Sequence, residues 1–187
     1  MGLIELLREV FNSAAKKASK ELSKDKKKVV FPKLPETYEE FIALPQAKLE
    51  TPYDTAAMTV LAFSYYPKDK DLSLRMLNYL RGPRALTPVN EMFFADRFRD
   101  KDYIPRSYFK GATVENDYTP SEPYTVIPFT NPHSDLQENM KRIWLTSAGA
   151  DSPRYIDARL AKDKKWYLWE QYMLVDIRPI ASENPWA

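Results

Sequence analysis

The last third of the chain most constrains what it can fold into, because apolar and polar residues alternate there in three successive stretches. These stretches cover residues 141–147, 153–161 and 165–177, and short runs of turn or charged residues separate them. Alternation with a period of two places successive side chains on opposite faces of a β-strand, and short spacers favour antiparallel neighbours. The sequence therefore predicts an antiparallel β-meander in this part of the chain.

The alternation also assigns side chains to the two faces of the sheet. In the first strand, Arg142 and Trp144 are predicted to point to one face, whereas Ile143 and Leu145 point to the other. The charged residues 162–164 are predicted to form the tip of the hairpin between the last two strands. We expect helices to cover one face of this sheet.

Helical periodicity dominates the first half of the chain. Four helices are predicted, over residues 37–44, from Thr51 or Asp54 to residue 66, over 71–82 and over 88–98. The first begins at Thr37, which can form a capping box with Glu40, and the second is a nearly continuous apolar run that Pro67 stops. Gly82 followed by Pro83 is typical of a helix C-terminus.

The segment between residues 105 and 132 is rich in proline and has few long apolar runs, so only short edge strands are expected, around residues 107–109 and 124–129. Helices followed by a meander indicate an α+β fold, in which the helical first half packs on one face of a curved antiparallel β-meander in the second half. Folds of the nuclear-transport-factor type share this order of elements, which makes a cone-like sheet an open alternative for its shape.

The first 30 residues differ in character from the rest. Apolar residues recur at threes and fours from residue 3 to residue 22, which predicts an amphipathic helix, and the lysine-rich run that follows predicts a basic linker. Residues 1–30 carry eight Lys and Arg against four Asp and Glu, whereas the remainder carries 20 against 22. The predicted organisation is therefore a helix with a basic linker over residues 1–30 and a single α+β domain over residues 31–187.

The N-terminal helix has several possible roles. It can pack on its own domain, or form a homo-oligomer through residues 3–22. Attachment to a membrane surface is disfavoured because the helix lacks the tryptophan anchors of an interfacial helix. Nucleic acid is not expected as a partner, since the remainder of the chain is slightly acidic and offers no basic groove.

Composition excludes several classes of chemistry. The 187 residues include no cysteine and one histidine, which excludes disulfides, cysteine-ligated zinc, iron–sulfur clusters, thiol nucleophiles and two-histidine zinc sites. Four glycines are too few for a glycine-rich phosphate cradle. We therefore expect no cofactor and no metal. Long apolar windows and a signal-peptide pattern are lacking, so a soluble, cytoplasmic protein is expected.

Four local runs carry a resemblance to a known family. The runs are LNYLRGP at residues 77–83, RSYFKGAT at 106–113 with ENDYTP at 115–120, PYTV at 123–126, and VDIRP at 175–179 with the ending NPWA at 184–187. Together they resemble an uncharacterised domain family of Firmicutes and related gut bacteria, over residues 36–187. The resemblance implies a bacterial source and a single domain, and it passes on no catalytic residues.

Aromatic content is the remaining clue to function, with 12 Tyr, 9 Phe and 4 Trp, many of them in the predicted β half. Tyrosines interleaved with arginines can line a surface that stacks on a flat ligand or grips an extended peptide. Alternating aromatics also serve the packing of a sheet on helices. The candidate ligand-binding residues are Tyr108, Tyr118, Tyr124, Arg106, Arg142, Arg154, Arg178 and Trp186.

A smaller set of residues could carry acid–base chemistry. His133 lies in a polar turn, and a neutral imidazole beside a carboxylate is a common proton shuttle, although an exposed loop histidine has the same sequence context. Two carboxylates that face each other across a cleft could hydrolyse a glycoside. The candidates are His133, Glu122, Asp157 and Glu170.

These observations favour a non-enzymatic binding or protein-interaction module that holds an unknown protein or peptide on an aromatic and arginine face of the sheet, with the N-terminal helix for self-association. One alternative is a hydrolase-type enzyme with acid–base groups in a helix–sheet cleft. Another is a peripheral membrane or scaffold protein that acts through residues 1–28. An enzyme would need two titratable groups within hydrogen-bond reach of a shared space.

Overall fold

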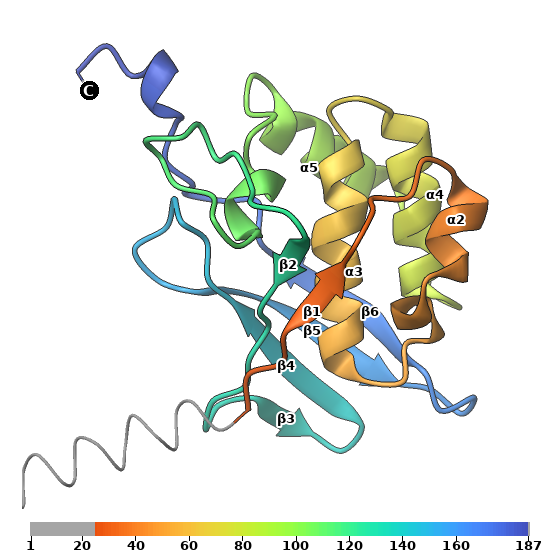
Figure 1. The fold of residues 1–187 in the computed structure, drawn as a ribbon. Coiled ribbons are helices and arrows are strands. Elements are labelled where there is room, and N and C mark those ends of the chain that lie inside the picture. The colour runs from red at the N-terminus through yellow and green to blue at the C-terminus, as the bar shows by residue number, and fades with distance from the viewer. Residues whose placement is uncertain (1–24, 187) are drawn as a thin grey trace, which may run out of the picture.

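The structure is a computed structural model that describes residues 25–186 (Figure 1). The amphipathic helix predicted over residues 3–22 lies outside the described residues. Helices occupy the first half of the described chain, strands occupy most of the second half, and the helices contact the sheet. The predicted α+β class is therefore confirmed.

Four α-helices follow one another in the first half. They are α2 (Tyr38–Ala43), α3 (Pro52–Tyr65), α4 (Lys70–Arg81) and α5 (Pro88–Phe98). Each agrees with a predicted helix to within one residue at either end, and of the two predicted starts of α3 the structure has the one at Thr51. Capping explains this agreement. The Thr51 hydroxyl accepts from the backbone N–H of Asp54, and the Asp54 carboxylate accepts from that of Thr51. Such caps satisfy N–H groups that no helical carbonyl can reach.

The main sheet is antiparallel, with the strand order β3 (Asp135–Gln137), β4 (Met140–Leu145), β5 (Arg154–Leu160) and β6 (Trp166–Tyr172). The last three strands are the predicted meander. A separate two-stranded sheet pairs β1 (Val29–Phe31) with β2 (Tyr124–Val126), which is part of the edge strand predicted over residues 124–129. The sequence gives no indication of β1 or β3, because three residues make too short an alternation to recognise.

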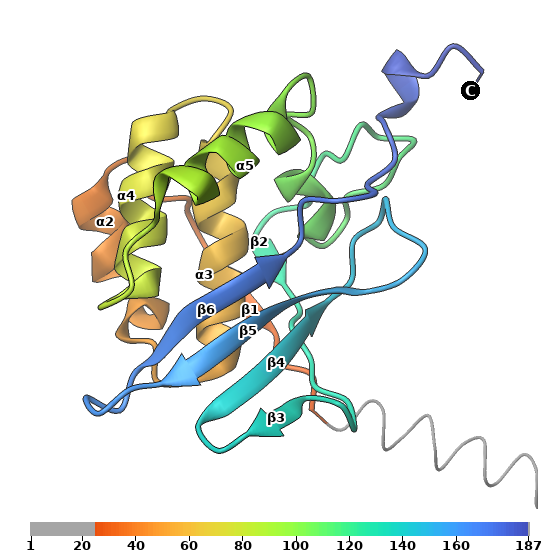
Figure 2. The ribbon, with the colours of Figure 1, turned by 180° about the vertical axis from the view of Figure 1, so that it is seen from behind.

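The central helix α3 positions the sheet. It contacts α4 and also β4, β5 and β6, and most of its side chains are buried. The sheet residues Ile143, Leu145 and Ile156 are buried beside the helices. The Thr55 hydroxyl donates to the Trp166 carbonyl at 2.5 Å, which ties α3 to β6. Figure 2 shows the sheet in front of α3, which therefore covers only one face of it.

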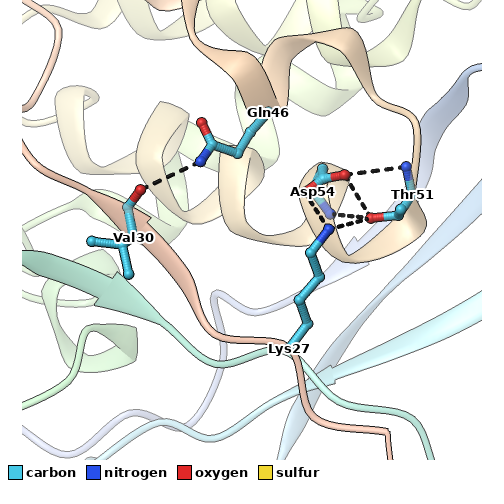
Figure 3. A network of polar contacts seen from close by, with 5 residues as sticks. All are labelled: Lys27, Val30, Gln46, Thr51 and Asp54. Carbon is cyan, nitrogen blue, oxygen red and sulfur yellow. Dashed lines mark hydrogen bonds and ion pairs between the residues drawn. The ribbon is translucent and has the colours of Figure 1, made fainter.

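The chain before β1 is tied to the N-terminal end of α3 (Figure 3). Lys27 Nζ lies 2.9 Å from Asp54 Oδ1 and 3.1 Å from Thr51 Oγ1, so that its ammonium group joins the capping box of α3. The Gln46 side-chain amide donates to the Val30 carbonyl at 3.3 Å. The charged run after residue 24 is therefore anchored to the domain at Lys27.

One predicted strand is wrong. Residues 107–109 do not form an edge strand, because the 3-10 helix η2 (Pro105–Tyr108) occupies this segment. Pro105 stands at the start of η2, where its missing N–H costs no hydrogen bond. The Ser107 hydroxyl donates to the Ile104 carbonyl at 2.7 Å, and such local bonds compete with strand pairing. Two more 3-10 helices are η1 (Pro45–Lys48), which follows α2, and η3 (Ala181–Glu183), which lies near the C-terminus.

Candidate functional site

The face of the sheet that points away from α3, called the outer face below, gathers aromatic and charged side chains. Strand register places on it Arg142 and Trp144 of β4, Tyr155, Asp157 and Arg159 of β5, and Glu170 and Tyr172 of β6. Trp169 also belongs to this face, because its ring contacts the Arg159 guanidinium. The outer face points toward the viewer in Figure 2, and no helix of residues 25–186 covers it.

An irregularity in β6 sets the position of Trp169. Asp157 pairs with Glu170, while the next residue, Ala158, pairs with Leu168, so Trp169 is an extra residue in β6. A β-bulge of this kind re-aims a side chain and breaks the alternation. Trp169 and Glu170 consequently share the outer face, although strict alternation assigns them to opposite faces.

Three rings form a row across β4, β5 and β6. Trp144 meets Tyr155 edge to face with ring centroids 5.0 Å apart, and the centroids of Tyr155 and Tyr172 are 4.6 Å apart. The Arg142 guanidinium lies 3.8 Å from the Tyr155 centroid. Tyr172 ends the row and is 46% exposed. Partial desolvation raises the pKa of Tyr172 above its ordinary value, and its phenol can donate a hydrogen bond.

Trp169 forms a second aromatic centre on the outer face. The guanidinium carbons of Arg84 and Arg159 lie 4.3 and 4.7 Å from its ring centroid. Each contact has the geometry of a cation–π interaction. Arg84 follows α4 and reaches over the edge of β6, whereas Arg159 is exposed on β5 and forms no ion pair within the described range.

Two carboxylates lie opposite each other between these aromatic groups, Asp157 on β5 and Glu170 on β6. Like charges at opposite positions repel each other, and here each is paired with an arginine. Arg142 donates to both oxygens of Asp157, at 2.8 and 3.0 Å, and Arg84 Nη2 lies 2.8 Å from Glu170 Oε1. The hydrogen bond to Asp157 raises the pKa of the Arg142 guanidinium above its ordinary value. Both carboxylates are therefore engaged in ion pairs.

Strand β6 lies at an edge of the main sheet, and arginine side chains occupy a backbone carbonyl on its outer side near the middle of the strand. The Trp169 carbonyl accepts from Arg81 Nη1 at 3.3 Å and from Arg84 Nη1 at 2.6 Å. Nearer the start of the strand, the Trp166 N–H donates to the Leu49 carbonyl at 2.9 Å. A partner strand could not pair continuously with this edge. Recognition on the outer face would therefore depend on side chains.

A second concave surface, called the groove below, lies between the segment after β1, the end of α3 and the loop before β2. Its volume is about 790 Å³, and it brings together three predicted site residues, Arg106, Glu122 and Tyr124. The groove charges are largely satisfied within the chain. Arg106 pairs with Asp102 at 3.4 Å, and two other lining residues, Lys33 and Glu36, pair at 2.9 Å.

Tyr65 also lines the groove, and its hydroxyl donates to the Pro35 carbonyl. Burial is the main cause that raises the pKa of Tyr65 to about 12. The Tyr124 hydroxyl and the Glu122 carboxylate are 3.5 Å apart, at the limit of a hydrogen bond. The groove thus holds one weak contact, which joins the predicted residues Tyr124 and Glu122. It also holds the phenol of Tyr65, which stays neutral.

The two predicted tyrosines Tyr108 and Tyr118 face the core. They are 4% and 0% exposed, and their hydroxyls donate to the carbonyls of Met173 at 2.6 Å and Arg178 at 2.8 Å. Burial raises the pKa of both phenols. Their rings lie neither on the outer face nor on an open surface.

The other predicted residues are dispersed. Arg154 donates to backbone carbonyls, among them that of Val175 at 3.1 Å, and Arg178 pairs with Asp151 at 2.5 Å. His133 lies in an exposed turn after β2, and Trp186, near the C-terminus, is 93% exposed. None of these four predicted residues lies on the outer face or lines the groove.

The predicted residues that meet on the outer face are Arg142, Asp157 and Glu170. Sequence reasoning did not select Arg84, which comes from a loop distant in sequence, or Trp169, which a bulge re-aims. Trp144 and Arg159 could have been predicted from the sequence. Each lies two residues after a predicted residue of the same strand, Arg142 or Asp157, and therefore on the same face of the sheet.

Between residues 25 and 186, no group of three His, Asp or Glu side chains is placed to hold a metal ion. No described helix is long and apolar enough to cross a membrane.

The comparison with known families places most of the chain in one of them. Residues 33–181 match the family described as Domain of unknown function (DUF6935). The chain belongs to this family. The matched range includes every residue of the outer face, whereas Trp186 falls beyond it. No curated protein and no solved structure matches the chain significantly.

Proposed function

We propose that this domain is a binding module that holds a protein or peptide partner on its outer face. The observation that carries the proposal is the pair of ring and guanidinium groups, one around Tyr155 and one around Trp169, that share a sheet face which no described helix covers. Tryptophan, tyrosine and arginine are the residues most enriched among those that dominate binding energy at protein interfaces. Rigid aromatic rings also provide contact area at a low cost in conformational entropy.

The contacts of the outer face favour binding over hydrolysis. A general acid needs a carboxyl group that can hold a proton close to the bond it cleaves. Asp157 and Glu170, the candidate acid–base residues on this face, are each paired with an arginine. Among the candidate acid–base residues, Glu122 lies in the groove beside Tyr124, and the groove therefore serves as the control surface.

The proposal predicts that peptides selected by the protein bind through Tyr172 and Trp169. Peptides enriched from a random displayed library would be synthesised, labelled, and titrated with the full chain by fluorescence anisotropy. Tyr172→Ser is expected to weaken binding about tenfold, because it removes an exposed ring and a donor. Trp169→Ala is expected to weaken it about 30-fold, which corresponds to about 2 kcal/mol.

The matched control is Tyr124→Ser, which removes a half-buried tyrosine from the groove. We expect this variant to bind the selected peptides as the wild type does. Circular dichroism and thermal unfolding would establish that all three variants are folded. Loss of binding in Tyr124→Ser together with full binding in Tyr172→Ser would place the partner in the groove and refute the proposal.

The N-terminal segment is proposed to act in self-association through residues 3–22, in a cytoplasmic protein from the Firmicutes. The periodicity of its apolar residues supports a helix with one apolar face. A chain that lacks residues 1–24 retains Lys27 and its contact with Asp54. Light scattering should then give the mass of a single chain for the shortened protein and a multiple of 21.8 kDa for the full chain. Equal oligomeric states would refute self-association through this segment.

A further inference from the structure

One end of the outer face is hollowed into a small pocket. It has a volume of about 170 Å³ and lies between the segment after α4 and the start of the β5–β6 hairpin. Its walls include Pro83, Leu160, Ala161 and the rings of Tyr167 and Trp169. Arg81, Arg84 and Arg159 complete the lining, and almost all of the surface that the pocket exposes is apolar. The interior of the pocket is therefore apolar, although charged groups surround it.

Glycine makes this pocket possible. Gly82 ends α4 with a φ of 56°, and a Cβ at this position would lie 2.4 Å from the ring of Tyr167. Residues other than glycine rarely adopt such a backbone conformation, and none would fit against the ring without displacing it. The chain after α4 can consequently approach β6 closely enough to form one wall of the pocket.

Three arginines surround the pocket, and only one of them has a carboxylate partner within the described chain. Arg84 is paired with Glu170. Arg81 is 4% exposed and donates to two carbonyls, those of Arg84 at 2.9 Å and Trp169 at 3.3 Å. Burial lowers the pKa of Arg81 below its ordinary value. Arg159 is exposed at the rim, where its guanidinium lies over Trp169.

The hairpin beside the pocket adds further positive charge. Residues 159–165 contain four cations, Arg159, Lys162, Lys164 and Lys165, against one carboxylate, Asp163. That carboxylate is already engaged, because it accepts from the Tyr167 hydroxyl at 2.7 Å and from the Lys165 N–H at 3.1 Å. An anionic partner would therefore be attracted to this end of the outer face, and a cationic one repelled.

The size of the pocket indicates what can enter it. An apolar cavity of about 150 Å³ is large enough to bind benzene, so this pocket can hold the ring of a phenylalanine or a side chain of similar size. A neighbouring carboxylate on the same ligand would then lie near the cations of the rim.

We propose that the partner held on the outer face is an acidic peptide segment, which inserts one large apolar side chain into this pocket and sets flanking carboxylates against Arg159 and the hairpin lysines. This inference rests on the proposed function and adds the chemistry of the partner. Arg81 and Arg84 tie the segment after α4 to β6, so their role is partly structural, whereas Arg159 is free to contact the peptide.

The test uses three short labelled peptides of equal length. The first has a central Phe flanked by Glu and Ser, the second carries Lys in place of every Glu, and the third has Ala in place of Phe. Measured by fluorescence anisotropy at low salt, the first is expected to bind about tenfold more tightly than either of the others. Its binding should weaken as salt is added, because exposed charges are screened.

Charge reversal at the rim provides the decisive comparison. Arg159→Glu is expected to weaken binding of the Glu–Phe peptide about tenfold and to strengthen binding of the Lys–Phe peptide relative to the wild type. The matched control, Lys68→Glu, reverses an exposed charge at the groove and should change neither affinity. Because Arg159 is exposed, the variant is expected to fold, which circular dichroism would verify.

The outcomes separate this inference from the proposed function. If library-selected peptides depend on Trp169 and Tyr172 while the Glu–Phe peptide has no advantage, or Arg159→Glu has no effect, the acidic-peptide inference is wrong and the proposed function stands. If selected peptides bind independently of Trp169 and Tyr172, the proposed function is itself wrong. Preferential binding of the Lys–Phe peptide by the wild type would also overturn the inference.

Discussion

Replacing Phe63 by alanine is expected to lower the free energy of unfolding by about 3–5 kcal/mol. Phe63 lies near the end of α3, is fully buried, and meets the rings of Phe94 and Phe98 of α5 at centroid distances of 5.1 and 5.9 Å. The substitution removes these contacts and leaves a cavity that close-packed neighbours fill only in part. Since small domains are stable by about 5–15 kcal/mol in total, this loss is a large share of the stability.

Urea denaturation followed by tryptophan fluorescence measures this change. The matched control is Phe93→Ala on α5, which removes the same side chain from a position that is 37% exposed. We expect the control to cost about 1 kcal/mol or less. Equal losses for the two variants would contradict the central position of α3 in the core.

Signals local in sequence predicted the helices of this fold. The capping box of Thr51 and Asp54 fixes the start of α3, and Pro67 limits its end, so each boundary depends on a few neighbouring residues. The three strands of the meander are long enough for alternation to be recognised. By contrast, β1 consists of three residues, and its pairing with β2 joins positions about a hundred residues apart, which no local pattern contains.

The candidate site was harder to predict because it depends on tertiary contacts. Tyr108 and Tyr118 have the composition of a binding surface, but their hydroxyls find backbone acceptors inside the core. Trp169 becomes part of the outer face through a β-bulge, and Arg84 reaches it from the segment after α4. Residue type alone thus identified the aromatic and arginine character of the surface, but only part of its membership.

The ion pair of Arg142 and Asp157 links the stability of the domain to the shape of the outer face. The Asp157 side chain is 9% exposed and depends on Arg142 for both of its close charge contacts. The same guanidinium also stacks on Tyr155, in the middle of the aromatic row. A change at Arg142 therefore affects the buried carboxylate and the shape of the face together.

Arg142→Met is expected to lower the free energy of unfolding by about 3 kcal/mol, because it leaves the buried carboxylate of Asp157 without its cation. The double variant Arg142→Met with Asp157→Leu removes both charges, and we expect its stability to lie within about 1 kcal/mol of the wild type. Urea denaturation of the wild type, both single variants and the double variant would give the coupling energy between the two side chains.

An exposed pair provides the control for this cycle. Arg178 and Asp151 are also in contact, but their side chains are 52% and 95% exposed, so Arg178→Met is expected to cost about 1 kcal/mol or less. If Arg142→Met and Arg178→Met cost the same, burial of Asp157 does not make its ion pair important. If the double variant is as unstable as Arg142→Met, the loss comes from the stacking on Tyr155 and not from an unpaired charge.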